Sequence, residues 1–162
     1  MEYGKILERA KSRKKQIKLL LERLQKLSVK DVDSYFHLEH EKVFENIDCL
    51  KCANCCKTTG PLFTGKDVER IAKHLKLRPG QFIDQYLRKD EDNDYVLKST
   101  PCIFLDSSNY CSIYSIKPKA CGEFPHTDRK NMKEISHLTY NNSLMCPAVA
   151  QMLENIEIKL NK

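Results

Sequence analysis

Apolar residues in the first 27 positions recur at alternating spacings of three and four, which is the period of an amphipathic α-helix. The stripe consists of Tyr3, Ile6, Ala10, Arg13, Ile17, Leu20, Leu24 and Leu27. Arg13 is the one charged residue in it. The pattern predicts a single helix over 3–27 that packs on its own domain, and the same face would also suit a coiled-coil dimer.

A second amphipathic segment follows over 31–46, with Ser28 or Asp31 available to cap the start of its helix. The face expected to point inward contains Val32, Phe36, His40, Val43, Phe44 and Ile47. We expect His40 to be a hydrogen-bonded core histidine rather than a metal ligand. The two helices together predict an antiparallel helical hairpin over residues 1–47.

Shorter elements are predicted in the rest of the chain. Apolar spacing indicates helices over about 66–75, from Pro79 onward and over about 147–159, with a helical turn near Pro118. A strand is expected at 95–97, and a β-hairpin over 102–114 would carry Cys102 and Cys111 on its arms. Residues 122–142 are expected to be irregular. The predicted fold is mainly α with a small β-hairpin, in which a metal-stabilised cysteine-cluster domain over 48–162 follows the helical hairpin in one compact unit.

Positive charge is concentrated at the start of the chain. The formal net charge of the 162 residues is +6, and residues 1–27 account for all of it, with nine Lys or Arg against three Glu. We interpret this segment as a solvated helix face and do not expect nucleic-acid binding, because no aromatic residue lies between positions 5 and 26 to stack on bases. No apolar run could span a membrane and no export signal is visible, so we expect a cytoplasmic protein.

Eight cysteines are the most informative feature of the composition. They are Cys49, Cys52, Cys55, Cys56, Cys102, Cys111, Cys121 and Cys146. Disulfides are disfavoured because no export signal is visible and because four thiols within eight residues are too crowded for most disulfide geometries. Inert buried thiols would not explain the spacing of the cluster. We therefore interpret all eight as metal ligands.

The spacing of the cluster suits zinc or an iron–sulfur centre. Cys49, Cys52 and Cys55 form two overlapping CxxC knuckles, which can bind zinc or a [4Fe–4S] cubane. A ferredoxin would have cysteine where this chain has Thr59, and the radical-SAM spacing is also absent. Adjacent cysteines on an extended chain point to opposite sides, so Cys55 and Cys56 are expected to serve two centres. Eight sulfurs then make two four-sulfur sites whose membership the sequence leaves open, and metal binding should be coupled to folding.

Several motifs resemble the YkgJ-like CxxCxxCC cysteine-cluster family. They are Cys49-x2-Cys52-x2-Cys55-Cys56, Cys102-Ile-Phe-Leu, Cys111-Ser-Ile-Tyr114, Lys117-Pro118-x2-Cys121 and Phe124-Pro125, in that order. The resemblance covers about residues 47–148 and implies a zinc- or iron-chelating domain, with related cysteine motifs in flagellin lysine N-methylases. It also implies that all eight cysteines are family positions. The family usually has arginine where this chain has Lys117 and often where it has Gly122, so contacts made by those arginines do not carry over.

Three classes of function agree with these features. The first is a zinc and/or iron–sulfur protein whose centre is structural or sensory and which has a protein partner. The second is an iron–sulfur redox or group-transfer enzyme, or its partner subunit. The third is a protein-lysine methyltransferase-like modifier, for which no Gly-rich cofactor-binding loop is visible. We favour the first class. We assign no catalytic residue, because no nucleophile–base or paired-carboxylate arrangement is apparent, and the sequence does not decide whether the protein is an enzyme.

Overall fold

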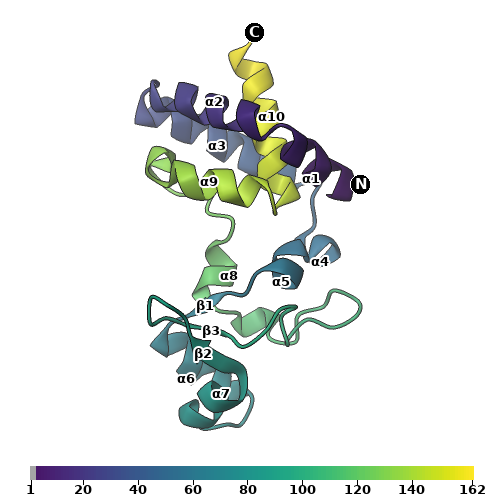
Figure 1. The fold of residues 1–162 in the computed structure, drawn as a ribbon, viewed down its shortest axis with the longest axis vertical. Coiled ribbons are helices and arrows are strands. Elements are labelled where there is room, and N and C mark those ends of the chain that lie inside the picture. The colour runs from purple at the N-terminus through teal and green to yellow at the C-terminus, as the bar shows by residue number, and fades with distance from the viewer. Residues whose placement is uncertain (1–2) are drawn as a thin grey trace. The chain divides into compact units, whose positions relative to one another are not determined.

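The computed structural model describes residues 3–162, and its contacts group the chain into two compact units. The first, called here the helical unit, comprises residues 1–52 and 125–162. The second, the central unit, comprises residues 53–124. Figure 1 shows the helices and strands of both. The predicted domain boundary near residue 48 stays a prediction, whereas the predicted fold class is confirmed: the chain is mainly helical with a small antiparallel sheet.

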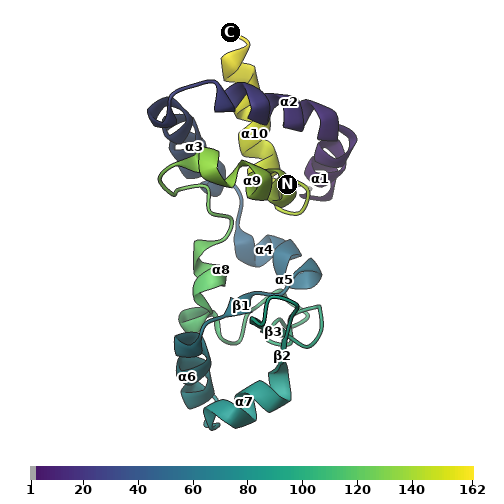
Figure 2. The same ribbon diagram turned by 60° about the vertical axis from the view of Figure 1, so that its left-hand side comes forward.

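The helical unit is built around its C-terminal helix. Its elements are α1 (Tyr3–Ser12), α2 (Lys14–Gln25), α3 (Val29–Phe44), α4 (Cys49–Cys52), a 3₁₀ turn (Met132–Ile135), α9 (Ser136–Ser143) and α10 (Pro147–Leu160). Helix α10 packs against α1, α2, α3 and α9, and Figure 2 shows it running between α3 and the α1–α2 pair. The two helices of the predicted N-terminal hairpin are therefore held together by a segment from the far end of the chain.

The predicted apolar stripe of the first helix is confirmed as a buried face. Ile6, Ala10, Ile17, Leu20 and Leu24 are all less than 10% exposed and lie on the side of α1 and α2 that meets α10. This face, which would form the seam of a coiled-coil dimer, is thus occupied within the chain. Every helix within residues 3–162 is too short or too polar to cross a bilayer.

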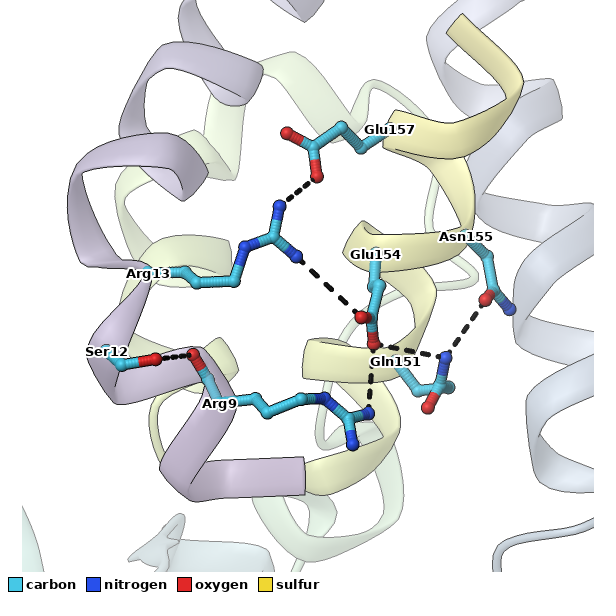
Figure 3. A network of polar contacts seen from close by, with 7 residues as sticks. All are labelled: Arg9, Ser12, Arg13, Gln151, Glu154, Asn155 and Glu157. Carbon is cyan, nitrogen blue, oxygen red and sulfur yellow. Dashed lines mark hydrogen bonds and ion pairs between the residues drawn. The ribbon is translucent and has the colours of Figure 1, made fainter. Parts of the chain in front are cut away.

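The predicted single helix over 3–27 was wrong at one residue, because the chain bends at Arg13. The backbone of Arg13 (φ −108°, ψ 24°) leaves the helical region between α1 and α2. Its side chain reaches α10, where the guanidinium lies 2.5 Å from Glu157 and 3.7 Å from Glu154. Arg9 also pairs with Glu154, at 3.1 Å, as Figure 3 shows. The charged member of the stripe therefore marks the place where the helix bends around α10.

Replacing Arg13 by methionine should destabilise the helical unit only slightly. These pairs are partly exposed, so we expect a loss of less than about 1 kcal/mol in the free energy of unfolding. The loss should shrink as salt is added. Urea unfolding at low and high ionic strength measures both effects, with the exposed Lys15→Met as the matched control on the same helix. A salt-independent loss of several kcal/mol would show that Arg13 acts through packing instead.

The central unit contains a small sheet covered by short helices. Its elements are α5 (Asn54–Thr58), β1 (Leu62–Phe63), α6 (Gly65–His74), α7 (Pro79–Tyr86), β2 (Leu87–Lys89), β3 (Tyr95–Leu97), a 3₁₀ turn (Tyr114–Ile116) and α8 (Lys119–Glu123). The strands are antiparallel in the order β1-β3-β2, with Val96 of β3 opposite Leu62 and Arg88. The predicted strand at 95–97 and the predicted helices near 66–75 and from Pro79 are confirmed.

One hydrophobic core supports this unit. Phe82 is fully buried, and its ring centroid lies 6.0 Å from that of Phe63 and 6.3 Å from that of Phe104. Ile71 and Ile113 are buried in the same cluster, and the side chains of Cys102 and Cys111 pack against it. The core therefore connects α6, α7 and the sheet to the loop that carries two of the cysteines.

The predicted β-hairpin over 102–114 was wrong, because the hairpin of this unit is formed by β2 and β3 instead. Residues 102–113 form turns with a single bridge between Leu105 and Cys111. The Asp106 carboxylate accepts the N–H groups of Ser108 (2.8 Å) and Tyr110 (2.9 Å). The Asp106 carboxylate thus accepts hydrogen bonds from N–H groups that would otherwise be available for strand pairing. This favours a tight loop over a pair of strands.

Residues 122–142 are not irregular as predicted, because most of α9 lies there. The helix has the sequence SHLTYNNS and no apolar periodicity, so its pattern gives no indication of a helix. It buries polar residues instead: Thr139, Asn142 and Ser143 are all less than 4% exposed. Asn142 donates to the Pro125 carbonyl at 3.2 Å. Hydrogen bonding rather than an apolar stripe places this helix.

His40 is hydrogen-bonded within the helical unit as predicted, but it is only partly buried. Its Nδ1 lies 2.8 Å from the hydroxyl of Thr127, which is itself 1% exposed, and its ring lies 4.7 Å from that of Phe44. Both ring contacts lie within the helical unit. His40 therefore helps to fix the segment after Pro125 onto α3.

Candidate metal centre

None of the eight cysteines is joined in a disulfide. They differ in exposure: Cys49 is exposed, Cys146 is buried and the other six are intermediate. Partly exposed thiols next to buried ones are available to an ion from solvent. The arrangement therefore leaves every predicted ligand chemically able to bind metal as thiolate.

The backbone brings Cys56, Cys102 and Cys111 close together in the central unit. The N–H of Cys102 donates to the carbonyl of Cys56 at 2.8 Å. The loop then folds back so that Ser112 N–H donates to the Phe104 carbonyl at 2.8 Å and Cys111 lies opposite Leu105. Cys56, Cys102 and Cys111 therefore come from segments that are adjacent in space although separated in sequence.

Cys121 joins this group through α8. Burial, followed by the negative charges that Cys56, Cys102 and Cys111 would carry, raises the pKa of Cys121 to about 12. A thiol that is buried, and whose ionisation would add to negative charge on its neighbours, needs a cation to ionise at neutral pH. Cys121 is thus electrostatically coupled to Cys56, Cys102 and Cys111.

Asp67 fixes α8 in place, and the sequence interpretation missed this role. Its carboxylate, 1% exposed, accepts hydrogen bonds from Thr64 N–H and Oγ1, from Arg70 and from the backbone N–H of Lys119, at 2.7–3.1 Å. Burial alone would raise the pKa of Asp67, but these donors outweigh it and lower the pKa. Arg70 also donates to the carbonyls of Ile116 and Lys117. Thr64 and Asp67 form a capping box, which sequence spacing could have indicated. The hydrogen bond from Lys119 to Asp67 could not be predicted, because the two residues are far apart in the sequence.

Asp67→Asn should loosen the segment that carries Cys121. The amide of the new asparagine can place an N–H group opposite the donors that now bind the carboxylate, and these donors then lack an acceptor. We therefore expect a loss of about 2 kcal/mol in the free energy of unfolding. Thermal and urea unfolding of the full chain measure it, and Asp84→Asn on the exposed side of α7 is the matched control. Equal stability of the two variants would contradict the role given to Asp67.

A second group of three cysteines lies in the helical unit. Cys49 and Cys52 begin and end α4, which Asp48 caps by accepting the Leu50 N–H at 2.9 Å. Cys146 lies at the N-cap of α10, and its own N–H donates to Asn142 at 2.7 Å. Burial raises the pKa of Cys146 to about 11, with further contributions from Cys49 and Cys52. The N–H groups of Ala148 and Val149 act in the opposite direction but do not outweigh burial.

Cys55 and Cys56 are adjacent on the short helix α5, not on an extended chain as expected. The Cys55 thiol donates a hydrogen bond to the Cys56 sulfur, and this is the main reason that the pKa of Cys56 falls to about 7. The argument that their side chains point to opposite sides of a strand therefore does not hold. Their assignment to centres depends on the surroundings of each sulfur instead.

Backbone N–H groups face three of the sulfurs in the same way. Burial raises the pKa of Cys102, Cys111 and Cys146, and backbone N–H donors oppose it without outweighing it: Phe104 and Leu105 at Cys102, Ile113 at Cys111, and Ala148 and Val149 at Cys146. In each case a donor lies two residues after the cysteine. Hydrogen bonds to sulfur stabilise thiolates and tune metal–sulfur centres. The pattern fits a metal-thiolate site, and sequence reasoning did not identify it.

Residues 48–147 match the family of CxxCxxCC domains, which is described as a "putative zinc- or iron-chelating domain". The chain belongs to the CxxCxxCC family. The matched segment contains all eight cysteines. Family membership supports metal binding by this CxxCxxCC protein and leaves open which metal it binds.

A similar relative is an uncharacterized protein of Methanocaldococcus jannaschii, which is 34% identical over 98 residues. The match covers 57% of this chain and 51% of the relative, so the chain spans about half the length of that protein. No solved structure matches this CxxCxxCC protein at a comparable level of significance.

The thiols of the CxxCxxCC domain do not yet form a coordination sphere. Across residues 3–162, no three Cys, His, Asp or Glu side chains are arranged so that they could hold a metal ion. The donor set nevertheless fits one, because free thiols with aligned N–H donors are the ligands that zinc and iron–sulfur centres use. Cysteine side chains reach other staggered rotamers with little cost, so binding would require side-chain rotation.

Proposed function

We propose that this CxxCxxCC protein binds zinc and/or an iron–sulfur centre through its eight cysteines, and that the centres are structural or sensory. The observation that carries the proposal is the set of eight cysteines outside disulfides, which have electrostatic neighbours among the other cysteines or backbone donors aimed at the sulfur. Neutral thiols stabilise one another little when they lie close together, whereas thiolates are strongly stabilised by a cation between them.

The construction of the central unit supports a structural role for metal. Its three strands contain two, three and three residues, and its loops are long for so small a sheet. Small domains with few regular hydrogen bonds are often stabilised by metal, since the site crosslinks segments that packing alone holds weakly. A centre made by Cys56, Cys102, Cys111 and Cys121 would crosslink α5, the 102–111 loop and α8.

An apolar surface on the same unit supports a protein partner. Ile103 is 62% exposed, Tyr110 59% and Tyr114 43%. All three belong to the loop and turn that carry Cys102 and Cys111. Aromatic residues exposed beside a metal-dependent loop would give a partner a surface that forms only in the metal-bound protein.

A second candidate is an iron–sulfur redox or group-transfer protein. It is favoured by the three-sulfur group of Cys49, Cys52 and Cys146, because three protein ligands leave one coordination position of a metal open. An open position is what a catalytic or substrate-binding centre uses. The structural proposal and this one differ in the metal expected and in its accessibility.

Metal analysis of the protein purified without oxygen tests the proposal. We expect stoichiometric zinc and/or iron, and a lower metal content when Cys56, Cys102, Cys111 and Cys121 are all replaced by serine. The exposed Ser107, Ser108 and Ser112 changed together to alanine are the matched control, which should retain the metal. Brown protein with iron and sulfide favours the second candidate, and protein that binds neither metal contradicts both.

A further inference from the structure

We infer that the cysteines load as two independent centres. Cys56, Cys102, Cys111 and Cys121, all in the central unit, form a closed four-thiolate site, and Cys49, Cys52 and Cys146, all in the helical unit, form a three-thiolate site with a position for an exchangeable ligand. This inference rests on the proposed function and adds which sulfurs share a metal and how the two sites differ. It narrows the eight proposed ligands to seven, because Cys55, the hydrogen-bond partner of Cys56, is assigned to neither site.

The four-sulfur set is connected by backbone contacts within the folded central unit. The hydrogen bond from Cys102 N–H to the Cys56 carbonyl connects the first two cysteines. The bridge at Leu105 and Cys111 returns the loop beside them, and the side chains of Cys102 and Cys111 pack on one core. These three positions can therefore turn their sulfurs toward a common point by side-chain rotation alone.

The fourth position is tied to the same framework by two polar anchors. Asp67 accepts the N–H of Lys119 at 3.1 Å, and Arg70 donates to the Lys117 carbonyl at 2.9 Å, so the segment before Cys121 is fixed to the start of α6. Helix α8 also packs on β1. Cys121 is affected electrostatically by the other three members of the set, which agrees with a shared site.

A lysine adds to the chemistry of this site. The Nζ of Lys117 lies 4.0 Å from the centroid of the Tyr114 ring. Its charge acts on both Cys111 and Cys121. A divalent ion with four thiolates carries a net charge of about −2, which a nearby ammonium group partly offsets. The four-thiolate site is thus provided with a counter-charge in its own unit.

The three-sulfur set is arranged differently. Cys49 and Cys52 lie on one short helix, and Cys146 lies at the N-cap of α10 with two backbone donors at its sulfur. Cys49 is exposed and Cys146 is buried, so the three cysteines differ in their access to solvent. A metal held by these three sulfurs would have a coordination position left for a small thiol, water or a partner's side chain.

Zinc stoichiometry of double variants of the full chain tests the partition. Wild-type protein reconstituted with zinc under anaerobic conditions should bind two ions. Cys111→Ser should lose one of them, Cys111→Ser with Cys121→Ser should still lose only one, and Cys111→Ser with Cys146→Ser should lose both, because losses add only between independent sites. Ser112→Ala, next to Cys111 and exposed, should lose none. Loss of both ions on changing Cys111 and Cys121, or of only one on changing Cys111 and Cys146, would overturn the partition.

A measurement on the unchanged protein covers the case in which the variants fail to fold. Loaded with ¹¹³Cd, the wild-type chain should give two cadmium resonances, the more deshielded one from the four-thiolate site. Addition of a small thiol should shift only the other resonance. A single resonance, or equal shifts of both, would overturn the inference. Failure of the wild-type chain to bind any zinc or cadmium would instead contradict the proposed function.

Discussion

Removing the metal from the purified protein should unfold the central unit and leave the helices of the helical unit in place. If the ion binds only the folded state, at a free concentration 1,000 times its dissociation constant it contributes about 4 kcal/mol to stability, which is a large share of the stability of a small domain. The sheet of the central unit has strands of only two or three residues. The helical unit also has cysteines, among them the buried Cys146, but its apolar core, which includes Phe36, Leu20 and Ile156, packs several helices together and should persist.

Hydrogen exchange of the metal-loaded and chelator-treated protein resolves the two units. We expect amide protection to fall in β1, β3 and α8 and to change little in α3 and in the second half of α10. The same treatment of the variant with serine at Cys56, Cys102, Cys111 and Cys121 is the control, since this protein should already show the unprotected pattern. Unchanged protection across residues 53–124 after metal removal would show that the apolar core of the central unit is sufficient by itself.

Glu39→Gln should cause the largest loss of stability of any single change in the helical unit that leaves its volume unchanged. Glu39, on α3, is 1% exposed, and its carboxylate lies 2.5 Å from Lys159 of α10. It also accepts from Asn155 at 2.7 Å. The Lys159 nitrogen is itself buried, so removing the carboxylate leaves an ammonium group away from water without its counter-charge. We expect a loss of about 3 kcal/mol in the free energy of unfolding, measured in urea.

Two controls separate this electrostatic effect from packing. Replacing both partners, Glu39→Leu with Lys159→Met, should recover most of the loss, because no buried charge then remains. Burial raises the pKa of Glu39, but the hydrogen bonds from Lys159 and Asn155 and nearby positive charge outweigh it, so the pKa lies below 4.5. The stability gap between wild type and Glu39→Gln should thus be full above about pH 5 and shrink as the pH falls through the folded-state pKa. A gap that is independent of pH would contradict the account.

Much of the helical part of the fold could be predicted from the sequence because apolar spacing determined it. The stripe from Ile6 to Leu24, the inward face of α3 and the course of α10 all follow a helical period, and the structure confirms them. The bend at Arg13 could not be predicted, since it depends on Glu154 and Glu157, which lie far along the chain. Helix α9 was missed because hydrogen bonds of Asn142 and its neighbours place it rather than an apolar pattern.

The candidate ligands could be predicted as a set, but their grouping could not. Eight cysteines in a distinctive spacing indicate metal chemistry, because few other uses need thiols so close together. Which of them lie side by side depends on long-range contacts such as Cys102 with Cys56 and on the anchor at Asp67. The interpretation of Cys55 and Cys56 failed because it assumed an extended backbone where the chain forms a helical turn.

X-ray absorption at the metal edge of the anaerobically purified wild-type protein tests the central claim most directly. If cysteines hold the metal, sulfur will dominate the first shell, at about 2.3 Å for zinc. The spectrum is recorded on the intact chain as purified, so it does not depend on the behaviour of any variant. A first shell made mainly of nitrogen and oxygen, at about 2.0–2.2 Å, would contradict the account.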